Sequence, residues 1–94
     1  IHSTQRLTHA NLGVLYTNSR HYRLAERHFS TAIGLGLREP ALFRYAGDVC
    51  YVLEEYDRAL QYYTSYLEFV PSDQKVRAAR ERVRQALSAP QKPQ

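Results

Sequence analysis

The chain has 94 residues, an apolar fraction of 44% and a net charge of +4, which suits one domain with a small hydrophobic core. A single cysteine, Cys50, excludes an intrachain disulfide, and no run of about 18 apolar residues is present to span a membrane. The polar start, residues 1–8, does not resemble a secretory signal peptide. The compartment stays open, with the cytoplasm favoured over an oxidising one.

Charge is distributed in three blocks along the chain. Residues 1–39 carry five basic and two acidic groups, residues 40–72 two basic and five acidic, and residues 73–94 six basic and two acidic. The attraction of charged partners depends more on these blocks of alternating sign than on the net charge of the whole chain. The chain begins at Ile1 and contains no methionine, so we expect an excised or processed piece with further sequence upstream.

The sequence repeats itself at one fixed spacing, which is the separation between Gly13 and Gly47. Two further identities and one aromatic match occur at the same spacing: Tyr22 with Tyr56, Ala25 with Ala59, and Phe29 with Tyr63. A regular period of this length is typical of stacked supersecondary units, each of which buries its apolar face against its neighbours.

The first unit reads as two helices. Apolar residues recur at three- and four-residue spacing from Leu7 to Tyr16, the polar run 18–21 predicts a turn, and a second stripe extends from Tyr22 to Ile33. Gly34 and Gly36 then favour the end of the second helix.

The second unit has the same organisation. Pro40 suits a first helical turn, a stripe runs from Phe43 to Leu53, and Glu54 and Glu55 precede a helix that Pro71 ends. Ser72 or Asp73 is expected to cap a fifth helix that reaches about Leu87. The tail 88–94, with Pro90 and Pro93, is expected to be disordered.

Small and aromatic residues have predicted packing roles. Gly13 and Gly47 are expected to let the helices of each hairpin approach closely, each meeting a small residue, Ala25 or Ala59, on the opposite helix. Tyrosines are expected to fill the wedge between hairpins: Tyr16, Tyr22 and Tyr56.

This pattern resembles the tetratricopeptide repeat, in which leucine-glycine is followed by tyrosine, alanine, an aromatic residue, alanine and a final proline. The pattern's positions are occupied by Leu12, Gly13, Tyr16, Ala25, Phe29 and Ala32 in the first unit, and by Ala46, Gly47, Cys50, Ala59, Tyr63 and Pro71 in the second. Departures are Leu37 for proline, Cys50 for tyrosine and Tyr66 for a small residue. The resemblance implies an all-α, right-handed α-solenoid of two hairpins, 6–39 and 40–73, with a capping helix at 74–87.

The resemblance also implies a concave groove lined by the first helix of each hairpin. Carried onto this chain, the candidate peptide-binding residues are Leu7, Ala10, Asn11, Val14, Asn18, Arg44, Tyr45, Asp48, Tyr51, Lys75 and Arg82. The groove is then apolar at its first helix and basic at its far end. We expect it to bind an extended or helical peptide with acidic character, with an affinity on the order of micromolar.

Several alternatives stay open beside this interpretation. The stripe Leu7, Ala10 and Val14 could instead be the seam to an upstream repeat, to the chain's own N-terminal segment, or to a second copy in a homo-oligomer. Arg44 and Asp48, four residues apart, could simply pair with each other.

Two chaperone-related functions are also weighed. A secretion-chaperone module is conceivable, although such a groove would be apolar along its whole length. A clamp for chaperone C-termini is rejected, because Ala10 and Val14 occupy the positions where the family's clamp carries lysine and asparagine.

No catalytic arrangement is recognisable, so we expect a protein that is not an enzyme, with no cofactor and no small-molecule substrate. The four histidines do not form a metal-ligand pattern: His2, His9, His21 and His28. Cys50 lies on an apolar stripe and is expected to be buried and inert. The acidic residues Glu54, Glu55 and Asp57 are expected to be solvated.

Basic residues are scattered around the fifth helix without aromatic residues to stack bases. They indicate a solvated capping helix, and nucleic-acid binding is a minor alternative.

Overall fold

The computed structural model describes residues 2–89 and the side-chain surroundings of residues 4–89. This part of the chain forms five α-helices and no strand, so the predicted all-α class is confirmed: α1 (His2–Asn18), α2 (Tyr22–Gly34), α3 (Pro40–Val52), α4 (Tyr56–Phe69) and α5 (Gln74–Ser88). The tail 88–94 was expected to be disordered. Its first residue, Ser88, is instead the last residue of α5, and residues 90–94 lie outside the described residues.

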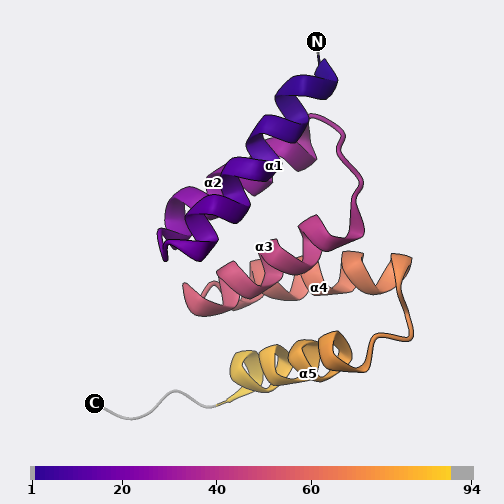
Figure 1. The fold of residues 1–94 in the computed structure, drawn as a ribbon. Coiled ribbons are helices and arrows are strands. Elements are labelled where there is room, and N and C mark those ends of the chain that lie inside the picture. The colour runs from indigo at the N-terminus through magenta and orange to yellow at the C-terminus, as the bar shows by residue number, and fades with distance from the viewer. Residues whose placement is uncertain (1, 90–94) are drawn as a thin grey trace.

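The helices pack in chain order. α1 packs on α2, α2 on α3, α3 on α4 and α4 on α5, and α1 makes a smaller contact with α3. Figure 1 shows the result as a pair (α1 and α2), a second pair (α3 and α4) and a single helix, α5, lying one after another. Each layer therefore depends mainly on its immediate neighbours in the sequence.

The turns inside the two helix pairs have the same geometry. Each turn contains one residue with positive φ: Arg20 at 65° and Glu54 at 60°. Each is closed by a main-chain hydrogen bond of 2.8 Å: His21 N–H to the Tyr16 carbonyl, and Glu55 N–H to the Cys50 carbonyl. Because both features recur at the spacing of the sequence repeat, the period of the sequence is also a period of the backbone.

A glycine beneath an aromatic ring joins the helices of each pair. A Cβ atom added to Gly13 would lie 2.5 Å from the Phe29 ring, and one added to Gly47 would lie 2.6 Å from the Tyr63 ring. The atoms nearest to each of these positions belong to the aromatic ring of the opposite helix, so the ring limits how close the two helices come. That each glycine also meets an alanine stays a prediction. The two alanines, Ala25 and Ala59, are fully buried.

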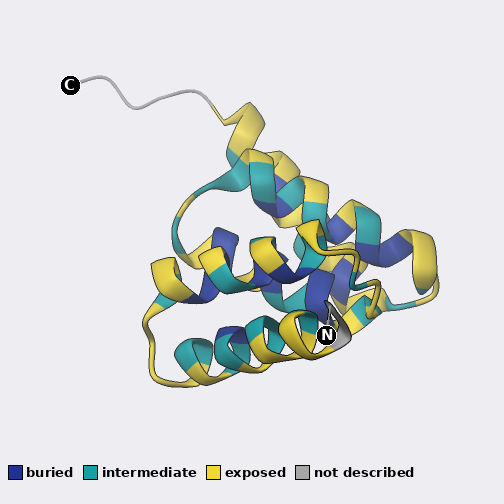
Figure 2. Ribbon diagram, turned by 90° about the horizontal axis from the view of Figure 1, so that it is seen from above, coloured by how far each residue is buried: buried dark blue, intermediate teal, exposed yellow. Residues whose placement is uncertain are grey.

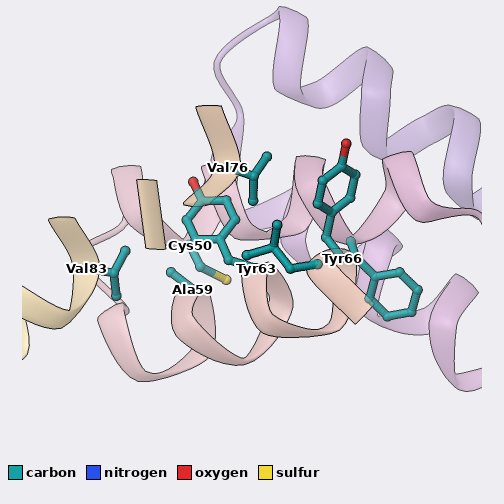
Figure 3. Packing of buried hydrophobic residues seen from close by; sticks show 8 residues of the cluster. Cys50, Ala59, Tyr63, Tyr66, Val76 and Val83 are labelled. Atoms are coloured by element: carbon teal, nitrogen blue, oxygen red, sulfur yellow. The ribbon is translucent and has the colours of Figure 1, made fainter. Parts of the chain in front are cut away.

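Two clusters of buried side chains hold the layers together. Figure 2 shows on the ribbon which residues are buried. The first joins α2 to α3 through Ala25, Phe29, Ala32, Leu42, Ala46 and Val49. The second joins α3, α4 and α5 through Phe43, Cys50, Ala59, Tyr63, Tyr66, Leu67, Val76 and Val83 (Figure 3). Burial raises the pKa of the Cys50 thiol to about 11, and the predicted burial of this residue is confirmed.

Ion pairs connect α2 to the start of α4. The buried Glu26 carboxylate binds Arg58, and Arg23 binds Glu55 at 2.5 Å. Arg58 also lies 3.6 Å from Glu55, so the four groups form one network across the boundary between the helix pairs. The expectation that Glu55 is solvated was wrong: its side chain is only 29% exposed, because both arginines approach it.

We predict that Gly47→Ala destabilises the protein by about 1–3 kcal/mol, because the new methyl group must displace the buried Tyr63 ring. Alanine normally stabilises a helix relative to glycine by roughly 0.5–1 kcal/mol, so the sign of the effect is diagnostic. The matched control is Gly34→Ala, where the added Cβ meets no atom within 4 Å. Urea denaturation of both variants tests the contact, and equal stability of the two would contradict it.

Candidate functional site

The predicted groove residues are distributed over two hollows that meet at α3. The first, here called the apolar hollow, lies between α1 and α3 and has a volume of about 250 Å³. Its walls contain five of the predicted residues: Leu7, Ala10, Asn11, Val14 and Tyr45. The remaining walls are residues that the prediction did not include as site residues: Leu37, Glu39, Ala41 and Leu42.

The second, here called the basic hollow, lies between α3 and α5 beside the end of α4, and has a volume of about 470 Å³. Four predicted residues line it: Arg44, Asp48, Lys75 and Arg82. Four others complete it: Tyr66, Asp73, Val76 and Ala79. Arg44 links the two hollows, because its guanidinium carbon lies 5.1 Å from the centre of the Tyr45 ring, which lines the apolar hollow.

Both carboxylates of the basic hollow are held by tyrosine hydroxyls. The Tyr63 hydroxyl donates to Asp48 at 2.5 Å, and the Tyr66 hydroxyl donates to Asp73 at 2.6 Å. Asp73 also caps α5, since it accepts from the main-chain N–H groups of Lys75 and Val76 at 3.1 and 3.2 Å. Each carboxylate is thus satisfied by neutral donors.

These hydrogen bonds set the direction of the nearby pKa values. The Tyr66 hydroxyl, followed by the Val76 N–H group, holds the pKa of Asp73 below its ordinary value. Burial, followed by the hydrogen bond to Asp48, raises the pKa of Tyr63 well above that of a free phenol. The two tyrosines therefore stay protonated near neutral pH and continue to donate to the carboxylates.

The cations of the basic hollow form no close ion pair with its two carboxylates, Asp48 and Asp73. Within the described residues, no ion pair joins Arg44, Lys75 or Arg82 to a carboxylate within 4.0 Å. The alternative in which Arg44 pairs with Asp48 is therefore not realised. Lys75 and Arg82 are exposed, and Arg44 is half-buried beside Tyr45. The hollow carries three positive and two negative charges, and its two carboxylates are already bound by tyrosine hydroxyls.

Two predicted site residues line neither hollow. Asn18 is exposed at the last position of α1, and the Tyr51 ring packs against Tyr56 with 5.6 Å between centroids. Conversely, Tyr66 and Asp73 were not predicted as site residues. The signal for them was the presence of tyrosine where the repeat has a small residue, seven positions before a helix-capping aspartate.

Two of the histidines, His9 and His28, contact each other on the α1–α2 pair. The Nδ1 atoms of His9 and His28 lie 3.0 Å apart, and Tyr16 stacks on His28. Burial, together with the charges of His9 and Arg27, lowers the pKa of His28. No group of three or more histidine, cysteine, aspartate or glutamate side chains that could hold a metal ion occurs among the residues the structure describes.

Comparison with known proteins finds no protein family whose pattern matches this sequence and no curated protein similar to it. In the described part of the chain, no helix combines the length and apolar character needed to cross a membrane. The resemblance to the tetratricopeptide repeat thus rests on the residues that recur at the repeat spacing. The two hollows and their charges are the features of this chain that bear on its function.

We predict that Tyr66→Phe raises the pKa of Asp73, because the hydroxyl is the main cause of its lowered value. A carboxyl group with a lowered pKa stabilises the fold at pH values above its unfolded pKa, about 3.9, and that contribution is lost as the pH falls through the folded pKa. The variant should therefore lose less stability than the wild type between pH 5 and pH 2.

NMR titration of the Asp73 carboxyl carbon measures this pKa directly. Tyr51→Phe is the control, since its ring packs on Tyr56 and contacts no carboxylate in the described structure. An unchanged Asp73 pKa in Tyr66→Phe would show that the hydrogen bond does not hold the carboxylate.

Proposed function

We propose that this chain is a non-enzymatic protein–protein interaction module that binds an acidic peptide segment across the apolar and basic hollows. The observation that carries the proposal is the charge state of the basic hollow. Among residues 2–89, no carboxylate lies within ion-pair distance of Arg44, Lys75 or Arg82, whereas Asp48 and Asp73 are bound by tyrosine hydroxyls. A carboxylate from a ligand would supply the missing partner.

The proposed architecture is a tetratricopeptide-type α-solenoid of two hairpins with α5 as its cap. Support comes from features that recur at the repeat spacing: the positive-φ turn residues, the closing hydrogen bonds and the glycines beneath aromatic rings. The polar character of α5 also fits, because its outer surface presents the exposed arginines Arg77 and Arg84 to solvent.

The different character of the two hollows sets the orientation in which the proposed peptide would bind. An apolar side chain would occupy the apolar hollow beside Leu7, Ala10 and Val14, and an acidic side chain would reach the basic hollow. Arg44 and Tyr45 lie at the junction, and arginine and tyrosine are residue types that often anchor interfaces. Because only two small hollows are engaged, we expect an affinity on the order of micromolar.

Fluorescence polarisation with labelled 12-residue peptides tests the proposal. Each peptide carries leucines near one end and glutamates near the other, separated by two to six residues, and each has a partner peptide with glutamine in place of glutamate. We predict that the glutamate peptides bind and that Arg44→Glu or Arg82→Glu weakens them about 3- to 10-fold, because each reversal replaces attraction by repulsion. Binding should also weaken as salt is raised.

The matched control is Arg77→Glu, which reverses a charge on α5 that, like Arg82, is exposed but lies outside the basic hollow. This variant should bind the glutamate peptides nearly as well as the wild type. Equal binding of the glutamate and glutamine peptides, or equal losses in all three variants, would overturn the proposal.

A further inference from the structure

The contact between the two helix pairs shows what kind of element one side of a pair binds. The equivalent side of the α1–α2 pair can be compared with it. On the side of the α3–α4 pair that faces α2, Ala46 and Val49 of α3 are covered: they are 0% and 1% exposed and pack with Phe29 and Ala32 of α2. On α4, Arg58 binds the buried Glu26 of α2. A helix such as α2 is therefore what this side of a helix pair accommodates.

The corresponding side of the α1–α2 pair is uncovered. One repeat before Ala46, Val49 and Arg58 stand Leu12, Leu15 and Leu24, here called the outer face. Leu15 is 60% exposed, the highest value among the exposed large apolar side chains of the described residues, and Leu24 is 37% exposed. Where Val49 is covered by α2, its counterpart Leu15 faces solvent, so the outer face is an unoccupied copy of an interface already present in the molecule.

Charge restricts what could cover this face. Residues 4–38 contain a single carboxylate, Glu26, which is buried and bound to Arg58 on the opposite side of the pair. Arg27 is exposed one helical turn from Leu24, and Arg20 is exposed in the adjacent turn. A second copy that docked through its own outer face would bring equally basic surfaces together, whereas a helix bordered by carboxylates would be attracted.

We propose that the outer face binds an amphipathic α-helix of another protein, one with an apolar stripe bordered by acidic residues, in the way that α2 covers α3 and α4. Leu12 and Leu15 supply the apolar contact, and Leu24 replaces Arg58, so the bound helix carries an apolar residue where α2 carries Glu26. Arg20 and Arg27 attract the acidic border. This surface is separate from the two hollows and does not depend on the peptide-binding proposal.

Two stapled helical peptides based on residues 22–37 test this surface. Both carry Glu26→Leu, to match Leu24, and the acidic peptide also carries Arg23→Glu and Arg27→Glu. We expect the acidic peptide to shift the amide NMR signals of Leu12, Leu15 and Leu24 in the labelled protein. The basic peptide, with both arginines retained, should bind several-fold more weakly because it is repelled by Arg20 and Arg27.

Leu15→Glu in the protein should weaken the acidic peptide at least 10-fold, while Leu35→Glu, at another exposed leucine, and Lys75→Glu, in the basic hollow, should leave it unchanged. Leu15 is exposed, so its substitution should leave the helices intact, and far-UV circular dichroism checks that it does. Absence of signal shifts at the outer face, or shifts confined to the basic hollow, would overturn the proposal. A dimer of the unliganded protein that Leu15→Glu dissociates would also overturn it, because a second copy would then cover the face.

Discussion

The close approach of a glycine to an aromatic ring determines the geometry of each helix pair. Gly13 lies beneath Phe29 and Gly47 beneath Tyr63, with too little space between them for a methyl group. Because each ring is itself buried, moving it would disturb the cluster that joins its pair to the next layer. The separation of the helices within a pair thus fixes where the following pair and α5 can pack, and hence where the two hollows form.

Tyr63 connects this packing to the electrostatics of the surface. Its ring covers Gly47, and its hydroxyl binds Asp48 at the edge of the basic hollow. Tyr66, one turn further along α4, binds the Asp73 cap of α5 in the same manner. The neutral hydroxyls hold both carboxylates, which stay charged, and within the described residues neither carboxylate forms an ion pair with Arg44, Lys75 or Arg82. The hollow is net positive because three cations line it beside two carboxylates, and the proposed recognition of an acidic segment depends on that balance.

Much of the fold could be predicted from the sequence, because helix ends depend on local residues. Pro40 begins α3 and Asp73 caps α5 as expected. Contacts between side chains distant in sequence were harder to predict. The partial burial of Glu55 between two arginines, for example, depends on how α2 packs against the start of α4. For the site, the repeat register placed nine of eleven candidates at the hollows, but it could not reveal that Tyr63 and Tyr66 occupy the carboxylates. Those hydrogen bonds depend on the three-dimensional approach of α4 to α3 and α5.

The central claim is that two glycine–ring contacts, one in each helix pair, have the same geometry. A proton above the face of an aromatic ring resonates at a higher field than in a random coil. We therefore predict upfield-shifted Hα signals for both Gly13 and Gly47, with nuclear Overhauser effects to the rings of Phe29 and Tyr63 respectively. Gly34, which has no atom near the position of a Cβ, serves as the reference in the same spectrum. Random-coil shifts at Gly13 and Gly47, without contacts to either ring, would contradict the account.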